Sequence, residues 1–145
     1  MNFELSITIK SSPEEVFAFL RDKDLHEQEP GSPVILLEKT TTSHTGIGTC
    51  YREVVQMLPF YQGTIISEIT CFEPPHWLEE KFSGAGMRGY LSYQFVPEGD
   101  GTRLIQRQRI NFQGPLRFLH PLIRIVLLHR LTERLQEVKA ELEEG

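Results

Sequence analysis

The chain has 145 residues, a formal net charge of −5 and a sequence pI near 5.5. This length suits a single domain over residues 1–145, and no basic stretch is broad enough to follow a nucleic-acid backbone. The N-terminal residues lack the apolar core of a signal peptide, and no segment approaches the roughly 18 apolar residues of a membrane span, so we expect a cytoplasmic protein without a transmembrane segment.

Strands are predicted over most of the chain. Residues 2–9 alternate between polar and apolar side chains, which is the period of a half-buried strand. Ser12-Pro13 then provides a cap and a first-turn proline for a helix ending near Asp22, and residues 24–33, which contain prolines, favour a second short helix or turn. Six further strands are predicted at residues 34–43, 47–57, 60–72, 77–83, 88–96 and 102–112. Their short connections predict a curved antiparallel meander with one concave face.

A long C-terminal helix is predicted over residues 115–143, and it is the only element long enough to fill that concave face. Its later half carries one apolar stripe at helical spacing, formed by Leu127, Leu131, Leu135, Val138 and Leu142. The expected architecture is therefore an α+β fold with the helix packed against the sheet.

The start of this helix has two interpretations. In an unbroken helix, His120 and Arg124 would point with the later stripe, and the apolar residues opposite it would be Leu119, Leu122, Ile123 and Val126. Burying those four side chains would favour a homodimer through them. Alternatively, Pro121 begins the helix after a separate short turn, and Arg124 then extends into solvent.

Five segments in the same order carry a family resemblance: ITIKSSPEEVF (7–17), GIGT (46–49), FEPP (72–75), GTRL (101–104) and GPL (114–116). Together they resemble the SRPBCC or START-like superfamily, in particular its polyketide cyclase/dehydrase-type members. The resemblance implies a helix-grip fold, in which a seven-stranded antiparallel sheet surrounds a long C-terminal helix, with two short helices after the first strand and an apolar cavity inside. The superfamily binds lipids, sterols, polyketides and hormones, and a minority of its members are enzymes without a shared catalytic motif.

Motifs for cofactors and metals are absent or incomplete. Residues 84–89 match the glycine pattern of dinucleotide-binding loops, but a strand is predicted after them where that motif needs a helix. Pro30 replaces the second histidine of a zinc-binding HExxH sequence that begins at His26. Cys50 is expected to lie opposite about residue 67 and not beside Cys71, which excludes a disulfide. We therefore expect no cofactor, no metal and no disulfide.

Strand parity selects the residues that would line the cavity. Gln106 and Gln108 are equally compatible with lining the cavity and with an exposed edge. Tyr51 and Tyr93 are more typical of core aromatic residues with a hydroxyl at the cavity rim than of catalytic acids. The candidate ligand-binding residues are Tyr51, Ile65, Ile69, Phe82, Leu91, Tyr93, Gln106, Gln108, Ile110, His120, Arg124 and Leu128.

Proton transfer would need an acid or base in the same space. The candidate catalytic residues are Glu80, Tyr93 and His120. A Glu80 that faced the cavity would favour its protonated form, because burial disfavours charge. We favour the alternative in which a bulge or the opposite orientation leaves Glu80 in water.

Three functions are compatible with these features. The leading hypothesis is binding or carriage of a small hydrophobic or amphipathic ligand that is lipid-like, polyketide-like or aromatic. The second is a cyclase, dehydratase or isomerase that uses acid and base groups in the cavity, although no motif favours an enzyme. The third is a module that binds a protein, a second copy or a membrane through the start of the C-terminal helix. A wholly apolar cavity would favour carriage, and neighbouring acidic groups inside it would favour catalysis.

Overall fold

A computed structural model describes residues 1–21, 34–41, 44–58 and 61–144. The second short helix or turn predicted at residues 24–33 lies outside these described residues. The elements, in chain order, are β1 (Asn2–Ile9), α1 (Pro13–Arg21), β2 (Val34–Lys39), β3 (Cys50–Leu58), β4 (Tyr61–Glu73), β5 (Trp77–Gly84), β6 (Met87–Glu98), β7 (Gly101–Phe112), the 3-10 helix η2 (Gly114–Arg117) and α2 (His120–Glu144).

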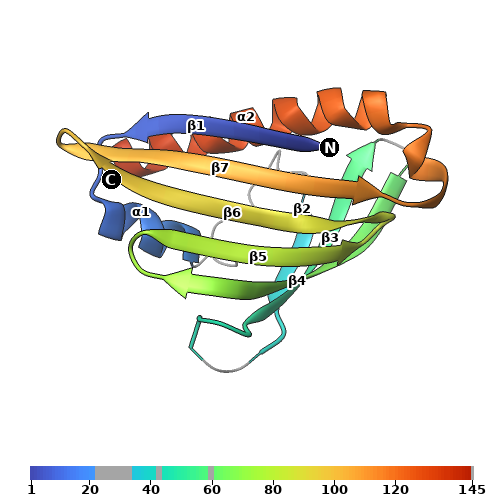
Figure 1. Ribbon diagram of the computed structural model, residues 1–145, viewed down its shortest axis with the longest axis horizontal. Helices are drawn as coiled ribbons and strands as arrows, with labels where there is room; N and C mark the ends of the chain where they lie inside the picture. The colour runs from blue at the N-terminus through green and yellow to red at the C-terminus, as the bar shows by residue number, and fades with distance from the viewer. Residues whose placement is uncertain (22–33, 42–43, 59–60, 145) are drawn as a thin grey trace.

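The strands form one seven-stranded antiparallel sheet in the order β1-β7-β6-β5-β4-β3-β2. The sheet curves strongly, and α2 runs along one side of it from the end of β7 (Figure 1). β1 lies at one edge of the sheet and pairs with β7, so the first and last strands of the chain are neighbours. The predicted α+β architecture, a curved antiparallel sheet with a long C-terminal helix, is confirmed.

The glycine-rich sequence at residues 84–89 forms a hairpin between β5 and β6. Gly84 and Gly86 have positive φ values of 129° and 78°, a backbone conformation that glycine adopts without steric cost. Ala85 between them also has a positive φ, of 54°. β6 begins at Met87, so these glycines precede a strand as predicted. The segment therefore lacks the helix that a dinucleotide-binding loop requires.

The two cysteines lie on different strands, Cys50 on β3 and Cys71 on β4. Cys50 pairs with Glu68 across β3 and β4, one residue from the expected partner. Cys50 and Cys71 are both free thiols, so the prediction of no disulfide is confirmed.

The long helix begins at His120 with Pro121 in its first turn, and η2 forms a separate turn before it. The unbroken helix with two opposed apolar faces was therefore wrong. Ile123 lies four residues before Leu127, so it continues the later stripe toward the N-terminus, and it is 2% exposed. Because Ile123 and Val126 face the sheet and Leu119 packs against the core, the four-residue dimer surface that included Leu122 is not present.

Two hydrophobic clusters hold α2 on the sheet. Leu135 and Val138 join the first cluster, where they pack with residues of α1 such as Phe17 and with Phe95 of β6. Near its start, Ile123 joins the second cluster, whose other buried members are Val55, Ile65, Met87, Ile110 and Leu116. The helix is therefore fixed to the sheet near both ends.

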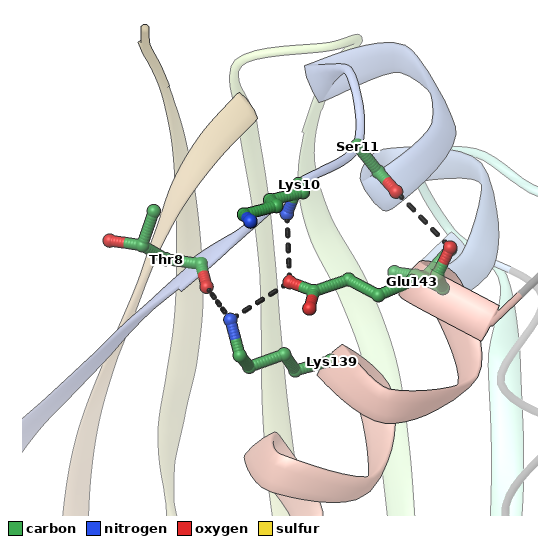
Figure 2. Close-up of polar contacts among 6 residues, drawn as sticks. Thr8, Lys10, Ser11, Lys139 and Glu143 are labelled. Carbon is green, nitrogen blue, oxygen red and sulfur yellow. Dashed lines mark hydrogen bonds and ion pairs between the residues drawn. The ribbon is translucent and has the colours of Figure 1, made fainter. Parts of the chain in front are cut away.

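Polar contacts also join the C-terminal end of α2 to the end of β1 and to the residues just after it (Figure 2). The backbone amide of Lys10 donates to Glu143 Oε2 at 3.0 Å, and Lys139 Nζ donates to the same oxygen at 2.8 Å and to the carbonyl of Thr8 at 2.7 Å. Ser11 Oγ donates to the carbonyl of Leu142 at 3.4 Å. The hydrogen bonds from Lys139 and Lys10 lower the pKa of Glu143.

We expect Leu135→Ala to destabilise the protein by about 2–5 kcal/mol, the usual cost of a large-to-small core substitution. Leu135 is 4% exposed in the first cluster. Glu137 is exposed two residues later, and Glu137→Ala should cost less than about 0.5 kcal/mol. Urea unfolding of both variants measures the difference, and similar losses would contradict the assigned helix face.

We expect Glu143→Gln to lower the melting temperature near neutral pH and to have less effect in acid. The pKa of Glu143 is lower in the folded protein, so its charged form stabilises the fold above the unfolded-state pKa. That contribution is lost as pH falls through the folded-state pKa. Thermal unfolding across pH measures it, with Glu141→Gln on the same helix as the control. A pH-independent difference would contradict this role.

Candidate functional site

A cavity of about 190 Å³ lies between the sheet and α2. Strands β3 to β7 form one wall, the start and middle of α2 form the other, and Leu20 of α1 contributes at the side. The lining residues are Leu20, Glu53, Val55, Ile65, Ser67, Leu78, Glu80, Phe82, Met87, Leu91, Tyr93, Gln106, Gln108, Ile110, Ile123, Val126, Leu127, Arg130, Leu131 and Arg134.

Strand register explains which side chains of the sheet reach the cavity. Glu80 of β5 lies opposite Leu91 of β6, and Leu91 lies opposite Gln108 of β7. In the next inward-facing row, Tyr93 lies opposite Gln106. Because side chains alternate between the two faces of a strand, all five residues share the concave face. The sheet wall therefore carries a polar region between apolar residues.

The two glutamines of β7 are hydrogen-bonded to each other. Gln106 Nε2 donates to Gln108 Oε1 at 3.3 Å, and the Gln106 side chain is 2% exposed. A buried amide needs such partners, since an unsatisfied polar group is costly away from water. The pair gives the cavity wall a fixed polar surface.

Four charged residues also line the cavity. Glu53 and Glu80 come from β3 and β5, and Arg130 and Arg134 come from successive turns of α2. All four side chains are half-buried. The cavity therefore has charged groups of both signs and is not wholly apolar.

Eight of the residues proposed from the sequence line this cavity. Glu80 is among them, so the favoured orientation that left Glu80 in water was wrong. The irregularity in register lies in β4, between Ile69 and Cys71, and β5 keeps the alternation that turns Glu80 inward. The eight residues are Ile65, Glu80, Phe82, Leu91, Tyr93, Gln106, Gln108 and Ile110.

The other five proposed residues do not line the cavity. Tyr51 and Ile69 are buried in the first hydrophobic cluster, and the Tyr51 hydroxyl donates to the carbonyl of Arg21 at 3.4 Å. His120 packs edge-on against Phe112 at 5.3 Å between ring centroids. Arg124 is exposed, as the alternative with a separate turn predicted, and Leu128 lies to the side of the cavity-facing stripe.

Sequence reasoning missed Arg130 and Arg134. Ile123, Leu127, Arg130 and Arg134 follow one another at spacings of four, three and four, which places them on one face of a helix. This spacing was a detectable signal. Only the interpretation with an unbroken helix placed an arginine on this face, and that arginine was Arg124, six residues before Arg130.

The cysteine thiols do not contribute to the site. Neither Cys50 nor Cys71 lines the cavity, and burial raises the pKa of both thiols. A raised pKa keeps a thiol protonated and weakly nucleophilic near neutral pH. Within the described part of the chain, no group of three or more His, Cys, Asp or Glu side chains is arranged to hold a metal ion. No helix in this part is long and apolar enough to cross a membrane.

The sequence profile of the family described as polyketide cyclase / dehydrase and lipid transport matches residues 1–143. No curated protein matches the chain by sequence.

Several solved structures share the fold over nearly the whole chain. The Zhui aromatase/cyclase of Streptomyces sp. R1128 has a TM-score of 0.83 at 12% identity, with 99% of this chain and 93% of that chain covered. A START superfamily protein from Mycobacterium smegmatis has a TM-score of 0.80 at 13% identity, with 99% and 97% covered. The protein TTHA0849 from Thermus thermophilus has a TM-score of 0.76 at 21% identity, with 98% and 97% covered. At these identities the similarity establishes the fold.

Proposed function

Because the chain belongs to the polyketide cyclase / dehydrase and lipid transport family, we propose that it binds a small amphipathic ligand in the cavity between the sheet and α2. The observation that carries this proposal is the composition of the cavity wall. Apolar side chains such as Leu91 and Ile110 share this wall with Glu53, Glu80, Gln106, Gln108 and two arginines. Such a wall suits a ligand with an apolar body and a few polar groups.

The cavity volume limits the size of this ligand. About 190 Å³ is somewhat larger than an engineered apolar cavity of about 150 Å³ that binds benzene. One ring or two fused rings therefore fit without rearrangement. A long lipid chain would require the cavity to widen, so a compact aromatic or polyketide-derived molecule is the favoured class.

A second candidate function is acid–base catalysis of the cyclase or dehydratase kind on such a ligand. Glu80 lies opposite Leu91, and Tyr93 is two residues further along β6, so the two polar side chains are diagonal neighbours on the cavity wall. A carboxyl group and a phenol at this spacing could move a proton within one ligand. Loss of water from a bound molecule in the wild type, but not in Glu80→Gln, would support this candidate.

Ligand binding is tested by filling the cavity. Leu91 lines it, and the side chain of the preceding residue, Tyr90, is 52% exposed on the other face of β6. We expect Leu91→Trp to abolish binding of 2-naphthamide, a neutral two-ring probe, because the indole occupies the cavity. Tyr90→Trp is the matched control and should bind the probe like the wild type. Isothermal titration calorimetry measures both, and circular dichroism checks that each variant is folded.

Native mass spectrometry of the freshly purified protein provides an independent measurement. We expect a bound molecule in the wild type that is lost in Leu91→Trp. If no two-ring probe binds and no molecule co-purifies, the proposed function is wrong.

A further inference from the structure

Arg130 differs from the other charged groups of the cavity. Glu53, Glu80 and Arg134 each interact with another group of the protein. Arg130 makes no hydrogen bond or ion pair with any residue that the structure describes, although its side chain is half-buried at the cavity wall. Among the residues that the structure describes, the Arg130 guanidinium therefore lies at the cavity wall without an anionic partner.

A half-buried guanidinium without a partner has lost part of its hydration. An anion in the cavity would restore that loss through charge-assisted hydrogen bonds, which are stronger than bonds between neutral groups. The guanidinium also presents several donors in a planar arrangement that matches a carboxylate. The chemistry of Arg130 therefore selects for an acidic ligand.

We propose that Arg130 binds the anionic group of the cavity ligand and that this ligand is a compact aromatic acid. The inference rests on the proposed binding function. Phe82, Leu91 and Ile110 on the sheet provide the apolar surface for the ring, and Arg130 on α2 lies across the cavity from them. The apolar body thus packs on the sheet while the acid faces the helix.

The test uses two probes of nearly the same shape, 2-naphthoate and its neutral amide 2-naphthamide. We expect the wild type to bind 2-naphthoate at least about tenfold more tightly, since the charged group adds a bond worth more than a neutral one. Arg130→Gln should remove this preference, which is measured as the ratio of the two affinities in the same variant. Isothermal titration calorimetry measures the affinities.

Arg124→Gln is the matched control, because Arg124 is on the same helix but exposed and outside the cavity. It should keep the full preference for 2-naphthoate. Arg130→Lys keeps the positive charge and should retain part of the preference, so it replaces Arg130→Gln if the latter is not folded by circular dichroism.

The outcomes separate this inference from the proposed function. Equal binding of both probes by the wild type would overturn the role of Arg130 while leaving the binding function intact. A preference that survives in Arg130→Gln, or is lost in Arg124→Gln, would also overturn it. Binding of neither probe would overturn the inference, and it would overturn the proposed function as well if no molecule co-purifies with the protein.

A separate feature is an apolar surface at the start of α2. Phe118, Leu122 and Ile125 are 81%, 46% and 69% exposed. Leu122 and Ile125 are three residues apart on one side of α2, turned away from the buried Ile123, and Phe118 lies in the turn just before the helix. Three large apolar side chains together in water indicate an interaction surface.

The charge around this surface indicates what covers it. No acidic residue occurs between Asp100 and Glu133, although the whole chain has a net charge of −5. Arg117 and Arg124 are both exposed beside the apolar residues. A second copy docked here with two-fold symmetry would bring like charges together, which is unfavourable.

We propose that this surface docks on an anionic lipid membrane. Exposed aromatic and aliphatic side chains insert at the headgroup level, and neighbouring arginines are attracted to anionic lipids. Docking of this kind needs no membrane-spanning segment, and the side of α2 that lines the cavity stays packed against the sheet.

Vesicle sedimentation tests the docking surface. We expect the wild type to sediment with vesicles of phosphatidylcholine and phosphatidylglycerol but not with pure phosphatidylcholine, and added salt should weaken the binding. Phe118→Glu with Ile125→Glu should abolish it. Ile47→Glu is the matched control, because Ile47 is 72% exposed between β2 and β3.

Absence of sedimentation with anionic vesicles would overturn the membrane proposal. Equal loss in Ile47→Glu would also overturn it, because the effect would then be one of net charge. Light scattering provides the remaining outcome: a wild-type dimer that becomes a folded monomer in the double variant would assign the surface to a second copy instead.

Discussion

The packing of α2 against the curved sheet is the interaction on which the rest of the structure depends. The helix buries Ile123 near its start and Leu135 and Val138 near its end, in two separate hydrophobic clusters. Between these contacts the side chains do not fill the space, and the cavity remains. Burial at both ends therefore fixes the helix, and the middle of its inner face is available for other residues.

That middle is where the protein places charge. A half-buried guanidinium lowers the stability of a core unless other groups compensate it, so Arg130 is a poor choice for packing alone. Its position is accounted for if the cavity holds a polar part of a ligand. Glu80 and Gln106 differ from Arg130, because each already interacts with another group of the protein.

The helix α2 thus has two functional sides under our proposals. Arg130 faces the cavity, while Leu122 and Ile125 lie on the exposed side near the helix start. Pro121 and the 3-10 turn before it allow both, because they set the helix phase that turns Ile123 inward and leaves Phe118 in water. A membrane surface would then lie beside the helix that also forms one wall of the ligand cavity.

Alternation and helical spacing are local properties, so they were enough to predict the order of the elements, the antiparallel sheet and the stripe that includes Leu135. The alternation of side chains also identified Gln106, Gln108 and Ile110 as one face of β7. The orientation of Glu80 and the position of Arg130 at the cavity wall came from the folded structure. A bulge in one strand reverses every later side chain, and the face of a helix that meets the sheet depends on where the helix begins. Both depend on contacts between residues far apart in the chain, which local patterns do not contain.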